Sequence, residues 1–124
     1  MVITHFKTIA DASDLPLICF QYPLSSGLGY PVDTHMKLME GVPTIRAIKD
    51  WCGNPMQHEQ HVRLLQSRAR PVNVLTTHSA WLLSSLVLGP SGLLSGSGSV
   101  IADLQAQLFR AVQANELHEA KRVY

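Results

Sequence analysis

Lys49 is the residue of this sequence whose setting most clearly suggests chemistry. It lies near the end of residues 44–50, a β-rich run, and the alternation of a strand would place Ile45 and Ala47 on its face and Ile48 on the other. A lysine stem between small or apolar neighbours lies in a dry interior, where the charged form is disfavoured and the free amine can attack a carbonyl. Most lysines at strand ends simply reach into water, so the strand alone leaves that alternative open.

Three further features could carry chemistry but have simpler explanations. His58 and His61 lie three residues apart on an expected helix, short of the metalloprotease spacing and without an evident carboxylate partner, so we expect them on a solvated outer helix face. Residues 96–99 (GSGS) precede a helix, as phosphate cradles do. Asp50 is expected on the strand face opposite the lysine, as a supporting or surface group.

The elements that would position these residues alternate along the chain. We expect strands at residues 15–20, 44–50, 72–76 and 92–95. We expect helices at residues 2–12, 33–40, 56–67, 79–88 and 101–114, and a last one that carries Leu117 and Val123. This alternation, with strands mostly apolar on both faces, predicts an α/β fold with a parallel sheet covered by helices.

Two local expectations concern the ends and faces of these helices. Asp33 and Thr34 are expected to cap the second helix, and Asn54, followed by proline, the third. In the third helix we expect Val62, Leu64 and Leu65 to form the buried side.

The composition is that of one globular domain. The 124 residues are 46% hydrophobic and 15% charged, enough to bury a core, and a net charge of +1 with scattered basic residues argues against a nucleic-acid partner. We expect Cys19 and Cys52 to be reduced thiols rather than a disulfide. Trp51 and Cys52 are expected to line or support a pocket wall by packing. No signal segment or membrane-spanning stretch is evident, so we expect a soluble, cytoplasmic protein.

Three segments together carry a resemblance to a known family. They are residues 20–27 (FQYPLSSG), 42–50 (VPTIRAIKD) with Gly53, and 88–95 (LGPSGLLS). In this order and at this spacing, the sequence resembles the dihydrodipicolinate synthase / N-acetylneuraminate lyase family, which consists of class I Schiff-base aldolases on a (β/α)8 TIM barrel. The likeness extends over essentially the whole chain, and the lysine segment and the glycine-bearing segment are its most specific parts.

The resemblance implies that residues 1–124 are a partial TIM-barrel domain with the fifth to eighth strands of the family fold. It implies that Lys49 forms an imine with a 2-keto acid, usually pyruvate, in a carbon–carbon lyase. No metal or organic cofactor is implied, because the lysine itself serves as the electron sink. The backbone at Leu94 and the loop at Gly96 would lie beside the keto acid. The implied ligand is a small molecule rather than nucleic acid or membrane, and the intact parent would be a homo-oligomer.

The sequence departs from the family pattern around the site. A family tyrosine that relays protons is replaced by Phe20, which would still line the substrate. Tyr22, on the same side of a regular strand, either supplies the missing phenol or packs against Pro23. Ser25 stands where dihydrodipicolinate synthases have an arginine for the second substrate's carboxylate, so the lysine-biosynthesis reaction itself is not expected. Residues 76–78 (TTH) replace a small turn, which indicates that the pocket mouth has diverged.

The first half of the family barrel has no counterpart in this sequence, including its Gly-Thr-Thr-Gly-Glu type loop for the keto-acid carboxylate. Four parallel strands leave two open edges, so we interpret the chain as half a barrel: a truncated gene, an incomplete gene model, or a piece that pairs with another copy or with the other half. A non-catalytic remnant or interaction module that keeps the fold is the alternative. The aldehyde partner and the choice between aldolase and dehydratase chemistry stay open.

Overall fold

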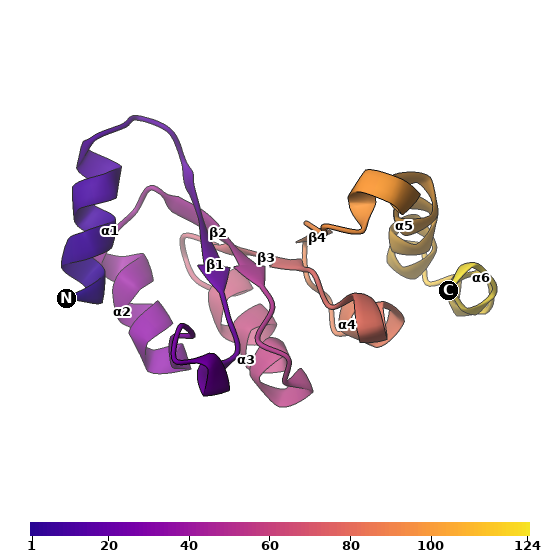
Figure 1. The fold of residues 1–124 in the computed structure, drawn as a ribbon. Coiled ribbons are helices and arrows are strands. Elements are labelled where there is room, and N and C mark those ends of the chain that lie inside the picture. The colour runs from indigo at the N-terminus through magenta and orange to yellow at the C-terminus, as the bar shows by residue number, and fades with distance from the viewer.

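Four parallel strands form one sheet in the order β1-β2-β3-β4. The computed structural model describes residues 1–124. The strands are β1 (Leu17–Gln21), β2 (Ile45–Asp50), β3 (Asn73–Thr76) and β4 (Gly92–Leu93). Each crossover between neighbouring strands carries a helix (Figure 1). The predicted parallel α/β sheet is therefore confirmed, with β1 and β4 as its two edges.

Six α-helices accompany the strands. They are α1 (Val2–Asp11), α2 (Val32–Gly41), α3 (Pro55–Gln66), α4 (Leu82–Val87), α5 (Gly98–Gln113) and α6 (Leu117–Val123), with short 3-10 turns η1 (Leu24–Ser26) and η2 (Ser79–Trp81). The Asn54 cap is confirmed, because its side chain accepts hydrogen bonds from the N–H groups of Met56 and Gln57 at 2.9 and 3.2 Å. The cap expected at Asp33 is wrong, because α2 already begins at Val32 without a side-chain cap. None of these helices is both long and apolar enough to cross a membrane.

The main core lies between one face of the sheet and the helices α1, α2 and α3. Its nine buried residues are Cys19, Leu38, Met39, Val42, Ile45, Ile48, Leu65, Val72 and Val74. Ile3 and Phe6 of α1 pack against this core. A second, smaller cluster joins α4, α5 and α6, which Figure 1 shows at the β4 end of the sheet. Burial of these apolar side chains is the main force that holds the helices on the sheet.

The opposite face of the sheet is open. Ile18 of β1 is 53% exposed, and Trp51, just past β2, is 45% exposed. Phe20, Lys49 and Leu75 on the same face are half-buried. In a closed (β/α)8 barrel this face would line the interior.

The pairing of β1 with β2 is irregular at its start. Leu17 pairs with Ile45, but the next residue, Ile18, pairs with Ala47, so the ladder skips Arg46. Ile45 consequently lies in the helix-covered core. The expectation that Ile45 shares a face with the lysine is wrong, because the skipped residue resets the alternation of the strand.

Candidate active site

Lys49 lies at the carboxyl end of β2, on the open face of the sheet. In the ladders it pairs with Phe20 of β1 and Leu75 of β3, so these three side chains share that face. Its Nζ atom lies 4.5 Å from the centroid of the Phe20 ring, within the range of a cation–π contact. The lysine is half-buried, so its amine is sheltered by an aromatic ring and still reachable from the open face.

Three aromatic rings gather around this position. The ring centroids of Phe20 and Tyr22 are 4.3 Å apart, and Trp51 lies 6.4 Å from the first and 5.8 Å from the second. The structure therefore brings together Lys49, Phe20 and Tyr22, three of the residues singled out in the sequence. Phe20 is the link between them, because its ring contacts both the Lys49 amine and the Tyr22 ring.

The other predicted site residues also follow the carboxyl ends of strands. Leu94 comes directly after β4, is 40% exposed and donates its N–H to the Thr76 carbonyl at 3.0 Å. It also borders a cavity of about 480 Å³ between β4 and α5. Gly96 lies exposed in the loop before α5, and Ser25 lies exposed in η1. No hydrogen bond joins Lys49 to Ser25 or to Gly96.

A buried polar network occupies the helix-covered side of the same strand end. Asp50 is fully buried, and its Oδ2 atom accepts hydrogen bonds from Nδ1 of His58 at 2.7 Å and Nδ1 of His61 at 2.8 Å. Both histidines are also fully buried. The prediction that they lie on a solvated helix face is wrong, because α3 turns them toward the sheet, where Asp50 is the carboxylate partner that the sequence did not reveal. Asp50 does lie opposite Lys49, as expected, but away from the surface.

The rotation of α3 about its own axis explains why the two histidines are buried. His58, His61 and Leu65 recur at helical spacing and are buried, whereas Leu64, expected on the buried side, is 37% exposed. The signal that could have found the network was the alternation of β2, which places Asp50 on the same side as the core residue Ile48.

The network continues through hydroxyl groups to the next strand. His58 Nε2 lies 2.9 Å from the Ser85 hydroxyl, Ser85 is hydrogen-bonded to Thr76, and Thr76 Oγ1 lies 3.1 Å from His78 Nδ1. It thereby joins β2, α3, α4 and the end of β3. Nearby, His35 Nε2 lies 2.5 Å from Gln21 Oε1.

Burial sets the ionisation of these groups. Burial raises the pKa of Asp50, but the hydrogen bonds from His58 and His61 outweigh that effect and hold the pKa below its usual range. Burial also lowers the pKa of His35 and that of His78 to about 4 each. Burial, together with the charge of Asp50, raises the pKa of the Cys52 thiol to about 12, so this thiol is protonated and unreactive at neutral pH. One group of three side chains, Asp50, Cys52 and His78, places possible metal-ligand atoms within 4.8 Å of one another.

Known proteins resemble this chain in sequence and in fold. The sequence profile described as "Dihydrodipicolinate synthetase family" matches residues 1–124. The chain belongs to this family. It is 31% identical over 122 residues to the 4-hydroxy-tetrahydrodipicolinate synthase of Leuconostoc mesenteroides, covering 98% of this chain and 40% of that protein. It is 28% identical over 120 residues to the enzyme of the same name from Chloroherpeton thalassium, covering 97% of this chain and 39% of that protein.

Comparison with a solved structure of the family shows how much of the fold is present. The dihydrodipicolinate synthase of Aquifex aeolicus superposes with a TM-score of 0.83 at 26% identity, covering 98% of this chain and 40% of that one. The chain thus spans about 40% of the length of the relatives that it matches. The predicted half of a TIM barrel, four parallel strands alternating with helices, is confirmed.

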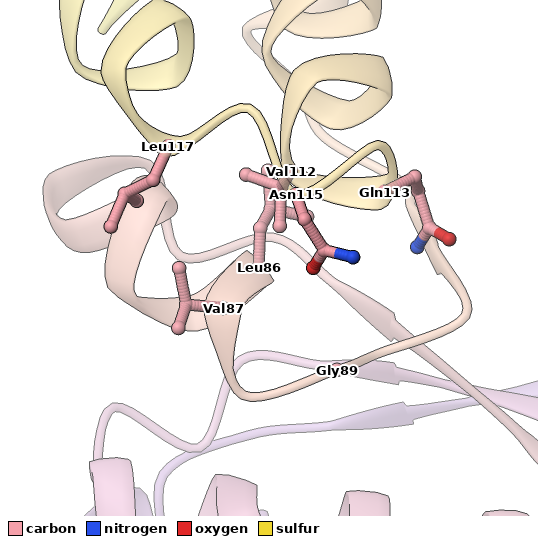
Figure 2. A pocket seen from close by; sticks show the side chains of 7 residues that line it. All are labelled: Leu86, Val87, Gly89, Val112, Gln113, Asn115 and Leu117. Carbon is pink, nitrogen blue, oxygen red and sulfur yellow. The ribbon is translucent and has the colours of Figure 1, made fainter.

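A hollow elsewhere in this family fold is not the candidate site. It has a volume of about 430 Å³ and lies between the end of α4 and the junction of α5 and α6 (Figure 2). Its lining residues are Leu86, Val87, Gly89, Val112, Gln113, Asn115 and Leu117, none of them ionisable. Gly89 precedes β4, so the hollow lies near the amino ends of the strands, whereas barrel enzymes carry their active sites at the carboxyl ends.

Proposed function

We propose that Lys49 forms an imine with a 2-keto acid such as pyruvate, in aldol or retro-aldol chemistry of the dihydrodipicolinate synthase / N-acetylneuraminate lyase type. The observation that carries this proposal is the place of Lys49 in a chain of this family: at the carboxyl end of β2, on the open face, with Nζ 4.5 Å from the Phe20 ring. Because the chain spans about 40% of its relatives, we assign the activity to a complete barrel that contains these four strands.

The proposed reaction begins at the lysine amine. The free amine of Lys49 adds to the keto carbon, water leaves, and a protonated imine forms. The imine withdraws electrons, so the adjacent carbon loses a proton and the resulting enamine adds to an aldehyde; the reverse sequence breaks the same carbon–carbon bond. The Tyr22 phenol would carry the proton between the carbon next to the imine and the aldehyde oxygen. This chemistry needs no metal or organic cofactor.

Backbone groups and small side chains would hold the rest of the substrate. The N–H of Leu94 already donates to Thr76, so Leu94 would present its carbonyl oxygen, with the Gly96 loop beside it. Phe20 would line the keto acid as an apolar wall. Ser25 carries no charge to pair with a carboxylate, so we propose a second substrate other than that of the lysine-biosynthesis enzyme.

The setting of this reaction is also a proposal. Both cysteines, Cys19 and Cys52, are buried and unbridged, which fits a cytoplasmic enzyme. We propose a homo-oligomer acting on a small molecule, with residues 1–124 as the second half of the barrel domain.

Imine trapping tests the assignment. Incubation with pyruvate and borohydride should add one reduced pyruvyl group to the peptide that contains Lys49, and Lys49→Met should remove this label. Lys7→Met and Lys37→Met are matched controls, since Lys7 and Lys37 are exposed on helices, and both should keep it. Label on Lys7 or Lys37 of the wild type, or none on Lys49 of a complete barrel, would end the assignment.

A non-catalytic remnant or interaction module is the second candidate. It is favoured by Phe20, which lacks a hydroxyl at the position where the family has its proton-relaying tyrosine. A complete barrel that traps pyruvate at Lys49 but turns over no 2-keto acid would support this candidate over the enzyme.

A further inference from the structure

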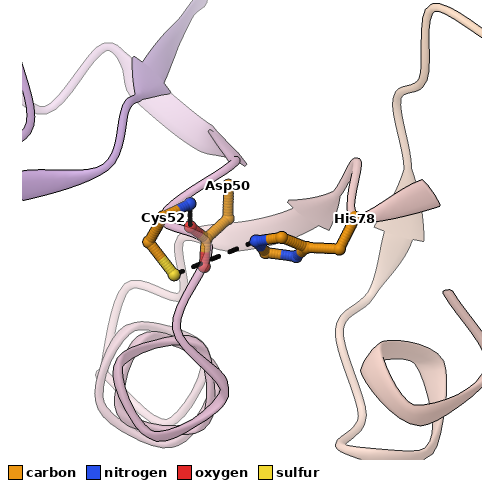
Figure 3. A group of neighbouring side chains, drawn as sticks. All are labelled: Asp50, Cys52 and His78. Atoms are coloured by element: carbon orange, nitrogen blue, oxygen red, sulfur yellow. Dashed lines mark hydrogen bonds between the residues drawn. The ribbon is translucent and has the colours of Figure 1, made fainter. Parts of the chain in front are cut away.

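Asp50, Cys52 and His78 form a compact, buried group beside the carboxyl ends of β2 and β3 (Figure 3). Cys52 Sγ lies 4.0 Å from His78 Nε2, and Asp50 Oδ1 accepts a hydrogen bond from the Cys52 N–H at 3.1 Å. None of the three residues is more than 4% exposed. The imine chemistry proposed for Lys49 uses none of them.

The hydrogen bonds of His78 fix its tautomer. Nε2 accepts from the Gly53 N–H at 3.1 Å, and a backbone N–H can only donate, so Nε2 carries the lone pair. In the neutral ring the proton is therefore on Nδ1, which donates to Thr76 Oγ1 at 3.1 Å. The lone pair of His78 Nε2 is therefore held by the Gly53 N–H, with Cys52 Sγ 4.0 Å from the same nitrogen, while Nδ1 is fixed by Thr76.

The hydrogen bonds that lead from Thr76 to Asp50 must all run in the same direction, toward the carboxylate. Thr76 donates onward to Ser85, Ser85 donates to His58 Nε2, and His58 Nδ1 donates to Asp50, whose carboxylate can only accept. Asp50 Oδ2 is thus held by two imidazoles, His58 and His61, while Oδ1 faces the loop that carries Cys52.

Metal ligands in proteins are commonly held by hydrogen bonds of this kind from neighbouring groups. A histidine that binds a metal usually donates its other N–H to a fixed acceptor, and a carboxylate ligand is usually hydrogen-bonded in turn. His78 and Asp50 both meet this condition, and the supporting groups, among them Thr76 and His58, are themselves buried.

The charge balance also favours a cation. Asp50 is fully buried, and the side chains that contact its Oδ2 atom are imidazoles rather than lysine or arginine. A divalent cation bound by one carboxylate, one thiolate and one neutral imidazole makes a group without net charge, which suits an interior better than an isolated charge. Zinc binds sulfur, nitrogen and oxygen ligands, and these three residues supply one of each.

We propose that Cys52, His78 and Asp50 bind a thiophilic divalent cation of the zinc class, with water in the fourth position. On binding, the cation replaces the thiol proton of Cys52, which passes to solvent, and the Cys52 hydrogen bond to the Asn54 carbonyl is lost. The N–H of Gly53 also releases His78 Nε2; Gly53 is an exposed loop residue at φ 72°, with space around it. The ion cross-links the loop after β2 to the loop after β3.

Cobalt binding to the purified chain tests this site. Co²⁺ should bind one to one, with the charge-transfer absorption of a cobalt–thiolate bond and the release of one proton per ion. Cys52→Ser should abolish the absorption, whereas Cys19→Ser, at the other buried cysteine, should keep it. His78→Gln should weaken binding more than about tenfold, and Thr76→Val by about tenfold through the lost support of Nδ1. His118→Gln, at an exposed histidine, should leave the affinity unchanged.

Three outcomes of the cobalt experiment would overturn the proposal. They are a folded wild-type chain without a cobalt–thiolate band, a band that survives Cys52→Ser, or binding that is lost in His118→Gln but kept in His78→Gln. Cadmium NMR of the wild type avoids any question of variant folding. A resonance typical of one sulfur ligand supports the site, and one typical of oxygen and nitrogen ligands alone contradicts it. None of these readouts depends on imine formation at Lys49.

Discussion

Lys49 and Asp50 are neighbours in the chain but belong to two unlike regions of the molecule. Lys49 lies half-buried on the open face, among aromatic rings, and its Nζ atom contacts the face of Phe20. Asp50 is fully buried on the helix-covered face, where α3 holds its carboxylate with two histidines. The difference shows how one strand end can carry an accessible amine on one face and be fixed in place through the other. A reactive group needs such a rigid support to keep its geometry.

The largest effect should come from removing the buried carboxylate. Asp50→Ala should lower the free energy of unfolding by about 3 kcal/mol or more, because it leaves the Nδ1–H groups of His58 and His61 buried without an acceptor. Lys49→Ala on the open face should change it by less than about 0.5 kcal/mol. Urea unfolding of the two variants measures the contrast. Equal losses in both would show that the two faces do not differ in this way.

Acid should weaken the helix-covered face. The pKa of His35 is about 4 in the folded chain and 6.5 as its ordinary value, so the unfolded chain binds a proton first as pH falls. Stability should therefore drop between about pH 6.5 and pH 4, by about 3 kcal/mol for His35, with His78 acting in the same direction. Asp50, whose folded pKa is depressed, loses its contribution only below about its ordinary value of 3.8.

Urea unfolding at pH 7 and pH 4.5 measures this drop, and His35→Gln should flatten it. His5→Gln, at an exposed histidine, serves as the control and should leave the drop as it is in the wild type. A stability that does not change between these pH values would contradict the assignment of neutral, buried imidazoles.

On the open face, the phenol should matter for turnover more than for binding. In a complete barrel, Tyr22→Phe should lower kcat by roughly a hundredfold, the usual scale for a lost acid or base, while borohydride trapping at Lys49 is less affected. Adding Phe20→Tyr should restore part of the rate, since the two rings are 4.3 Å apart. An unchanged rate in Tyr22→Phe would mean that this ring only packs.

The smallest effect concerns the second substrate. Ser25→Arg should raise kcat/KM by about tenfold for aldehydes that carry a carboxylate, through a charge-assisted pair, and leave neutral aldehydes unchanged. Steady-state kinetics with matched acidic and neutral aldehydes measures the ratio. If both classes change alike, Ser25 does not face the second substrate.

The sequence predicted the open face better than the covered one. Lys49, Phe20 and Tyr22 come from neighbouring strand ends, and parallel strands bring such ends together whatever their detailed packing. The role of His58 and His61 depended on the phase of α3 and on Asp50 in another element, and isolated histidines at helical spacing do not reveal a partner. The face of Ile45 depended on a single skipped residue, which strict alternation cannot foresee.

That skipped residue also bears on how the strand tolerates a change in length. Arg46 is exposed and unused by the ladder with β1, whereas Ala47, Ile48 and Lys49 each have a partner there. Deleting the Arg46 codon would make the strand regular without turning Lys49 away from the open face. Deleting the Ile48 codon would also leave five residues opposite the five of β1, but Ala47 would then take the core position of Ile48, and Arg46 would take the open-face position opposite Ile18. In a scan of single-codon deletions along β2, the loss of Arg46 should therefore lower the free energy of unfolding less than the loss of Ile48, which leaves a gap in the core.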